Sequence, residues 1–399
     1  MGFEIRAARP EEMEEFRRVA STALVLSPKI LKEMQAEWTL CAFEDGRLAT
    51  SYGVWPLTVR LNGDGIPVAG VTSVGTLPIY RRHGYLRKVI TTHLELLYER
   101  GEQPVAILYA SLAAIYQRYD YAVVSTRNSY NVEPRYLQFP QAQAAPGTFR
   151  EAGEDEFGVL VDLYRRFRAE RTGYLHRGRE MWEAGVLAPP PAGGLLNKVI
   201  YQENGEALGY VIYFVEPHPR GGMPGPGQHL SIRDLIWLNH STYQAIWEYF
   251  ANMDLVNNIT WERVPCDDPL PHLLLEPRML HTAANDGLLA RIVDIEKALP
   301  KRGYREEGML TFGILDDLCP WNRGRWRLEV SAGGASVSRE EGEPQLVMPI
   351  STLAMLFFGQ ISATEAARMG RLFVFEQDAL ALWDKVFRTA YRPFCADIF

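Results

Sequence analysis

Several features that would mark a specialised class of protein are missing from this sequence. It has no run of about 18 apolar residues, so no membrane span is expected. Its N-terminal stretch lacks the apolar segment of a secretion signal, which indicates the cytoplasm. No low-complexity tract interrupts the 399 residues. These absences leave a folded globular chain that is long enough for more than one domain.

Cysteine and histidine are sparse, and their spacing bears on metal and redox chemistry. The four cysteines have no pairwise metal-binding spacing, and a cytoplasmic chain is expected to keep them reduced. The eight histidines include no His-x-x-x-His pair, so we predict no metal site. We interpret His272, which lies in an apolar stretch, as structural.

Positive charge is in deficit, because 42 Lys and Arg face 49 Asp and Glu and the net charge is −7. A chain with this balance lacks the basic surface that general nucleic-acid binding requires, so no nucleic-acid partner is expected. The surplus of carboxylates mildly favours cationic substrates.

The basic residues nevertheless gather at one junction between an apolar stretch and a helix. The chain passes Pro78 into residues 81–84 (RRHG), and from Leu86 to Leu97 apolar residues recur every three or four positions, which predicts a helix. Helices usually begin with a Ser, Thr, Asp or Asn cap, whereas this one begins with basic residues at the positive end of its dipole. We interpret the turn as a seat for an anion; a solvated surface turn is the alternative.

The rest of the first part of the chain alternates helical and strand patterns. A helix is predicted over residues 11–23, and a hairpin over residues 39–54 turns at 44–46 (EDG). Residues 57–61 would continue this meander as a further strand. An apolar strand at 104–109 follows the basic junction and its helix.

A faint internal echo points to a repeat. The stretch from Glu4 resembles the stretch from Thr148, with Arg6 matching Arg150 and Glu12 matching Glu156. The match is either chance or the mark of a second copy that runs to about residue 285. That copy passes from strand to helix through an ordinary Asn cap at 239, so a repeat would have lost the anion seat.

The last part of the chain reads as a third, α+β unit. Strands are predicted around residues 308–317 and 325–339, and helices over 348–358 and 377–391. Residues 217–227 (PHPRGGMPGPG), before this part, predict a loop.

The basic junction resembles the acetyl-CoA pyrophosphate motif of GNAT-type N-acetyltransferases, Gln/Arg-x-x-Gly-x-Gly/Ala. Leu86 departs from the general motif as it does in the Eis-like (enhanced intracellular survival) branch, whose turn reads Arg-Arg-x-Gly-x-Leu. Residues 113–121 (AAIYQRYDY) and 267–280 (DDPLPHLLLEPRML) resemble two further segments of that branch, and Phe399 ends the sequence as a Phe ends theirs. The resemblance covers essentially the whole chain.

This resemblance implies an α+β fold of mixed α/β sheets, with tandem GNAT-like regions followed by a sterol-carrier-protein-like α+β domain. We predict a catalytic GNAT domain over residues 1–138 and a second GNAT-like domain without acetyl-CoA over 139–287. The C-terminal domain over 288–399 would supply the terminal carboxylate. A homo-oligomer, a hexamer in the family, is also implied.

Acetyl-CoA is the co-substrate that the resemblance implies. The strand before the junction would present backbone groups to the acetyl and pantetheine arm, and the N–H groups of the turn would hold the pyrophosphate. The implied cofactor-binding residues are Val74, Gly75, Thr76, Arg82, His83, Gly84, Tyr85, Leu86, Arg87, Ser111 and Leu112.

Tyr116 matches the general acid of the family, which protonates the departing CoA thiolate. A phenol with a pKa near about 10 suits this step. Tyr119 and Tyr121 lie close enough in sequence to serve instead, and a buried structural role is the other alternative.

Phe399 matches the family's base, which is the C-terminal carboxylate itself. A free α-carboxyl has a pKa of about 3.3–3.7, and burial would raise it. Phe394 and Phe399 are candidate apolar anchors for the tail. A packed tail without chemistry is the alternative.

Together these residues predict an acetyl-CoA-dependent N-acetyltransferase that acts on a primary amine by direct attack in a ternary complex. The amine would be aminoglycoside-like, polyamine-like or a lysine side chain. Aminoglycoside-modifying relatives carry acids around the amine pocket, whereas this chain has Ile398 beside its last residue and apolar residues at 24–26, which favours a less charged amine. The alternative function is a CoA- or lipid-binding module without turnover.

Overall fold

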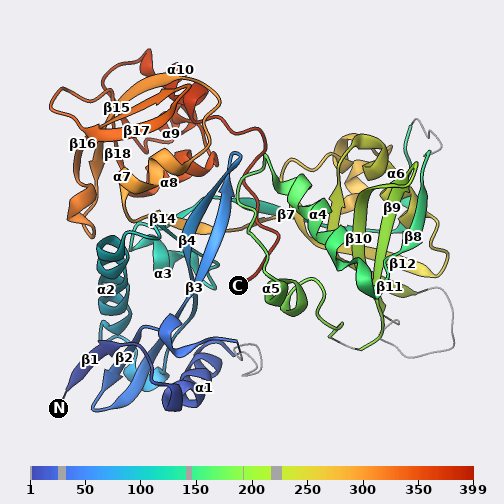
Figure 1. Cartoon of the computed structure of the whole chain (residues 1–399), viewed down its shortest axis with the longest axis horizontal. Helices are drawn as coiled ribbons and strands as arrows, with labels where there is room; N and C mark the ends of the chain where they lie inside the picture. The colour runs from blue at the N-terminus through green and yellow to red at the C-terminus, as the bar shows by residue number, and fades with distance from the viewer. Residues whose placement is uncertain (1, 26–32, 141–145, 192, 217–226) are drawn as a thin grey trace. The chain divides into compact units, whose positions relative to one another are not determined.

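The structure is a computed structural model that describes residues 2–25, 33–140, 146–191, 193–216 and 227–399. The chain folds into two compact units (Figure 1). The first unit contains Met1–Val124, Leu288–Thr389 and Phe399, and the second contains Ser125–Gly287 and Ala390–Ile398. No helix in the described ranges is long and apolar enough to cross a membrane.

The N-terminal part of the first unit is built on a seven-stranded sheet in the order β1-β2-β3-β4-β5-β14-β6. Its strands are β1 (Phe3–Arg6), β2 (Cys41–Glu44), β3 (Arg47–Leu61), β4 (Asp64–Thr76), β5 (Val105–Leu108), β6 (Ala122–Val123) and β14 (Leu289–Ile292). Its helices are α1 (Met13–Leu24), α2 (Tyr85–Arg100) and α3 (Ala113–Gln117). The helix predicted from Leu86 and the hairpin predicted at residues 44–46 are confirmed. Residues 57–61 are not a separate strand, because β3 continues through them in one ladder with β4.

The C-terminal part of the first unit is an α+β domain with a five-stranded sheet in the order β17-β16-β15-β18-β19. Its strands are β15 (Gly308–Leu315), β16 (Gly324–Ser331), β17 (Gly334–Arg339), β18 (Leu346–Pro349) and β19 (Phe373–Val374). Its helices are α7 (Ile295–Ala298), α8 (Ile350–Phe358), α9 (Ala363–Arg368) and α10 (Ala379–Val386).

The helix predicted over residues 377–391 is shorter than expected. It ends at Val386, and the buried Arg302 donates from Nη2 to the carbonyl of Phe387 just beyond it, at 2.5 Å. A cation that binds the last carbonyls stabilises a helix end. The apolar periodicity continues past Val386, so the prediction placed the end of the helix too late.

The second unit is also built on a seven-stranded sheet, in the order β13-β7-β12-β11-β10-β9-β8. Its strands are β7 (Thr126–Val132), β8 (Thr148–Glu151), β9 (Leu196–Glu203), β10 (Glu206–Glu216), β11 (Gln228–Trp237), β12 (Val256–Pro265) and β13 (Ala283–Asp286). Its helices are α4 (Phe157–Arg168), α5 (Arg179–Ala184) and α6 (His240–Ala251). The strand β7 precedes the boundary predicted at residue 138, yet it pairs in this second sheet. The loop predicted at 217–227 lies outside the described residues except for Gly227.

The sequence echo corresponds to a repeated local structure. Arg6 Nη1 lies 2.7 Å from Glu12 Oε2, and Arg150 Nη1 lies 2.6 Å from Glu156 Oε2. Each glutamate also accepts a backbone N–H three residues before it, at 2.8 Å in both cases. An Arg–Glu pair therefore fixes an equivalent strand-to-helix turn in each sheet, which favours a repeat.

Candidate functional site

The seven-stranded sheet of the first unit opens where β4 and β5 separate. These parallel strands pair only over Val68–Val71 and Val105–Leu108. Beyond Val71, β4 keeps its antiparallel partner β3 as far as Thr76, but no described strand pairs with its other edge. The predicted contacts Val74, Gly75 and Thr76 lie on this one-sided part. This edge, which no described strand covers, can offer backbone groups to an extended ligand.

The basic junction lies at the end of this open segment. Gly84 has a left-handed φ of 78° and immediately precedes α2, which no described side chain caps and which has no acidic residue in its first turn. The first backbone bond along the helix is donated by Lys88 to the Gly84 carbonyl, at 3.2 Å, so the N–H groups before it point out of the helix end. Arg82 and His83 are exposed beside them. This combination of open donors, dipole and cations suits an anion.

Four of the predicted residues share one apolar cluster. Tyr85 and Tyr116 are buried members of it, and Val74 and Leu86 pack against it. The same cluster contains Val71 and Leu108, the residues at which the pairing of β4 with β5 ends. Arg87, Ser111 and Leu112 are exposed, and the latter two lie directly before α3. The structure thus brings the strand, the helix start and the tyrosine together around the opening.

Tyr116 is buried on the short helix α3, with its ring 6.0 Å from that of Tyr121 in an edge contact. Burial, helped by the nearby Tyr119, raises the pKa of Tyr116 to about 12. A phenol with a raised pKa stays protonated at neutral pH and can donate a proton. Tyr121 is buried more completely, and burial likewise raises the pKa of its hydroxyl.

Phe399 lies at the same opening. The Thr72 hydroxyl donates to the Phe399 carboxyl oxygen at 3.2 Å, and the Phe399 ring centroid lies 5.6 Å from that of Tyr109. A Cβ added to Gly70 would come within 3.2 Å of the Phe399 ring. The last residue is therefore fixed against β4 where the strands part.

Sequence reasoning missed Gly70, Thr72 and Tyr109 as neighbours of Phe399. A glycine inside an apolar strand often marks a site that another group approaches closely. Gly70 could therefore have predicted a close neighbour at this point of β4. Thr72 and Tyr109 carry no such local signal.

It also missed how the tail before Phe399 is held in the second unit. Arg177, Asp234 and Asp397 form a buried group, with Nη1 to Asp234 Oδ2 at 2.5 Å and Nε to Asp397 Oδ1 at 2.7 Å. The N–H of Phe394 donates to the Thr172 carbonyl at 2.9 Å, and the Phe394 ring is buried as predicted for an anchor. This segment is therefore fixed by charge and by packing.

No three His, Cys, Asp or Glu side chains group as metal ligands in the part of the chain that the structure describes. His272 lies in a short 3-10 turn of the second unit.

Three family models match the chain. An acetyltransferase (GNAT) domain covers residues 4–124, a second acetyltransferase (GNAT) domain covers 173–292, and a sterol carrier protein domain covers 295–396. The boundaries that we placed at residues 138 and 287 stay predictions.

Relatives match over most or all of the chain. An uncharacterized N-acetyltransferase of Streptomyces griseus subsp. griseus is 29% identical, with 100% of both chains covered. The N-acetyltransferase Eis of Mycobacterium bovis is 26% identical over 89% of this chain and 90% of its own. The crystal structure of Eis1 from Mycobacterium abscessus has a TM-score of 0.83 at 26% identity, with 100% of both chains covered. The chain is thus an acyltransferase, an Eis-like N-acetyltransferase of the GNAT superfamily with a sterol-carrier-protein-like C-terminal domain.

Proposed function

We propose that this enzyme transfers the acetyl group of acetyl-CoA to a primary amine by direct attack in a ternary complex. The observation that carries the proposal is the position of Phe399, whose carboxyl oxygen accepts a hydrogen bond from Thr72 at the point where β4 and β5 separate. A carboxylate at that place lies beside the strand edge that would hold the acyl donor.

The residues at the opening fit acetyl-CoA. When bound, this molecule supplies the activated acyl thioester and an anionic pyrophosphate. The uncapped start of α2 offers N–H donors to the pyrophosphate, and the space around Gly84 is open, since a Cβ added there would meet no atom within 4 Å. The free edge at Val74 to Thr76 would hold the amide-bearing arm.

The chain's own groups would then carry out the proton transfers. The ammonium of the substrate gives one proton to the Phe399 carboxylate, and the neutral nitrogen attacks the thioester carbon. As the C–N bond forms and the C–S bond breaks, Tyr116 gives its phenolic proton to the leaving sulfur, and the new amide nitrogen gives its surplus proton to the Tyr116 phenolate. The raised pKa of Tyr116 keeps the phenolic proton in place until the sulfur becomes basic.

The acceptor would be an aminoglycoside-like, polyamine-like or lysine amine of modest charge. Ile398, beside the proposed base, is an exposed apolar residue, and so is Val25 at the end of α1, whereas Leu26 lies outside the described residues. Apolar residues at these positions, where aminoglycoside-modifying relatives carry acids, favour a less charged amine. The cytoplasmic location and the homohexamer implied by the resemblance belong to this proposal as well.

Release of free thiol from acetyl-CoA tests the proposal directly. The full chain is mixed with acetyl-CoA and a panel of aminoglycosides, polyamines and lysine peptides, and the thiol released is compared with that of amine-free controls. We expect amine-dependent release. Binding of acetyl-CoA without release for any amine would favour a CoA- or lipid-binding module.

A further inference from the structure

Arg291 on β14 is a charged residue in the seven-stranded sheet of the first unit, between β5 and β6. It is 0% exposed, and it is the partner of Ala106 in the ladder with β5. A buried guanidinium is costly unless its N–H groups find acceptors and its charge is balanced. The acceptors that surround Arg291 come from two different segments of the unit.

One segment is the turn that follows the proposed acid. Arg291 Nη1 donates to the Tyr119 carbonyl at 2.9 Å and lies 3.3 Å from Asp120 Oδ2. The same turn closes on Tyr116, whose carbonyl accepts the N–H groups of Tyr119 and Tyr121 at 2.9 and 3.3 Å. Asp120 sits in it with a left-handed φ of 59°, a conformation that costs free energy in a residue other than glycine. Arg291 is therefore an external partner that holds this turn.

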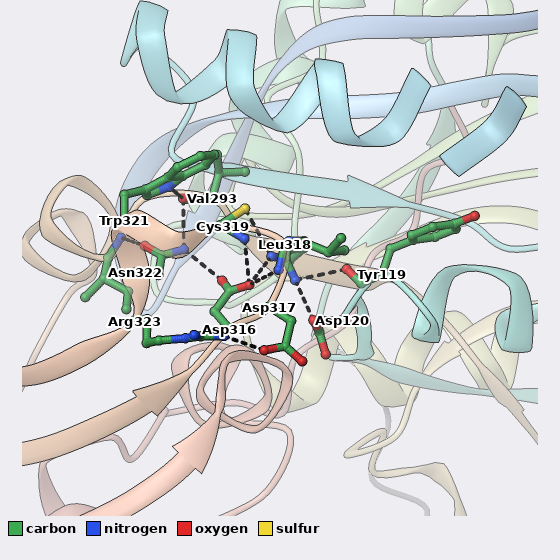
Figure 2. A network of polar contacts seen from close by, with 12 residues as sticks. Tyr119, Asp120, Val293, Asp316, Asp317, Leu318, Cys319, Trp321, Asn322 and Arg323 are labelled. Atoms are coloured by element: carbon green, nitrogen blue, oxygen red, sulfur yellow. Dashed lines mark hydrogen bonds and ion pairs between the residues drawn. The ribbon is translucent and has the colours of Figure 1, made fainter. Parts of the chain in front are cut away.

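The other segment is a loop of the C-terminal domain. Arg291 Nη2 donates to Asp316 Oδ1 at 2.7 Å and to Cys319 Sγ at 3.1 Å. Burial raises the pKa of the Cys319 thiol to about 11, so it is neutral, and Asp316 is the buried carboxylate that balances the arginine. Figure 2 shows Asp316, Cys319, Tyr119 and Asp120 joined in one network of polar contacts.

Asp316 is itself held rigidly. Its Oδ1 accepts the N–H groups of Leu318 and Cys319 at 3.1 and 2.9 Å, and its Oδ2 accepts Asn322 Nδ2 at 3.1 Å. Asn322 Nδ2 also donates to the Val293 carbonyl, at 3.0 Å, just after β14 (Figure 2). A carboxylate with this many fixed donors cannot follow a displaced arginine, so it sets where the guanidinium lies.

We propose that Arg291 is a positioning residue for the general acid, and that Asp316 makes the C-terminal domain part of this device. The pair holds the carbonyl of Tyr119, this carbonyl holds the turn, and the turn fixes the position of Tyr116 beside the opening between β4 and β5. The inference rests on the proposed role of Tyr116. It assigns the C-terminal domain a task in acyl transfer that its fold does not imply.

The test compares Asp316→Asn with Asp317→Asn in the full chain. Asp317 lies on the same loop, but it is exposed and pairs with Arg323, so it is a matched control (Figure 2). We expect Asp316→Asn to lower kcat by roughly tenfold to a hundredfold, as expected of a displaced catalytic group, with the KM for acetyl-CoA changed less than about twofold. Asp317→Asn should leave both constants unchanged.

A double-mutant cycle with Tyr116→Phe separates positioning from plain support of the fold. If Arg291 and Asp316 act through Tyr116, Asp316→Asn will lower kcat no further once the hydroxyl is gone. Losses that multiply would overturn the inference while leaving the acid role intact. A Tyr116→Phe enzyme with normal kcat would remove the acid role and this inference together.

A milder variant covers the case in which Asp316→Asn does not fold. Asp120 is partly exposed, and asparagine tolerates its left-handed backbone, so Asp120→Asn removes only the charge. Folding is checked by circular dichroism, and the same cycle is run. An unchanged kcat in folded Asp120→Asn would then overturn the inference.

Discussion

The two GNAT domains contain the same strand-to-helix junction, but they finish it differently. Before α2 the chain turns through Gly84 with a left-handed backbone and leaves the helix without a side-chain cap. Before α6, Asn239 is extended, and its Oδ1 accepts the N–H of Thr242 at 2.8 Å and the hydroxyl of Ser241 at 2.9 Å. The Asn239 cap satisfies one of the N–H donors that an anion would need, whereas the start of α2 keeps its donors for the anion that we propose there.

The surroundings of the second junction reinforce the contrast. A cavity of ≈450 Å³ lies beside it, lined by Asn239 and His240, with Arg171 among its walls. The Arg171 guanidinium lies 3.9 Å from the ring centroid of Phe167 and 4.1 Å from that of Tyr391 in the tail. In the second domain, the Arg171 guanidinium thus packs over aromatic rings, and one of these rings, Tyr391, belongs to the C-terminal segment. That the second domain does not bind acetyl-CoA stays a prediction.

The largest effect is expected from adding a carboxylate to the first junction. Gly84→Glu should abolish acetyl-CoA binding measured by calorimetry, because its charge would occupy the proposed pyrophosphate seat. Gly84→Asn is the control for backbone strain, since asparagine tolerates a positive φ and brings no charge. Equal affinity in folded Gly84→Glu and in the unmodified chain would remove the site from this junction.

The next largest effect concerns the acid. Tyr116→Phe keeps the ring and deletes the hydroxyl, so kcat should fall by about 10² to 10⁴ while acetyl-CoA binding persists. Tyr119→Phe is the matched control from the same turn. A loss of less than about threefold at Tyr116, or a larger loss at Tyr119, would move the role.

Local patterns were enough to predict the elements that form this junction. The spacing from Leu86 to Leu97 predicted α2, and the arginines with Gly84 predicted its open start. The pairing of β14 with β5 was not predictable, because β14 comes after the entire second domain and no local signal names its partner. Arg291 reads in sequence as one charged residue in an apolar strand, and only the fold brings Asp316 to it.

The candidate site likewise contains residues that local motifs predict and residues that only tertiary contacts bring in. Motif register predicted Tyr116 and Phe399 as functional residues, which stays a prediction, while their neighbours depend on tertiary contacts. Thr72 and Tyr109 meet Phe399 only because the tail returns to the first unit at its last residue. A contact between residues so far apart in the sequence cannot be predicted from local patterns.

A smaller effect is expected at the second junction. Asn239→Ala removes the cap of α6 and should cost about 1 kcal/mol of stability. Thermal unfolding would show a lower Tm, whereas acetyl-CoA affinity should stay the same. Weaker acetyl-CoA binding in this variant would contradict the division of labour between the two domains.

The smallest expected effect is an absence of change with pH. Because burial raises the pKa of Tyr116 to about 12, the phenol stays protonated well above the range of a free tyrosine. The rate of acetyl transfer should therefore show no fall between pH 8 and about pH 10 that depends on Tyr116. A loss of kcat with an apparent pKa near or below about 10, absent from Tyr116→Phe, would show an exposed phenol instead.

The central claim is that the carboxylate of Phe399 accepts the proton of the amine, and C-terminal amidation tests it most directly. Semisynthesis can replace this carboxylate with an amide of nearly the same shape, which removes the charge and leaves the ring against Gly70 and Tyr109. We expect a large loss of kcat/KM for the amine with acetyl-CoA binding unchanged. Normal turnover by the amidated enzyme from pH 6 to pH 9 would contradict it.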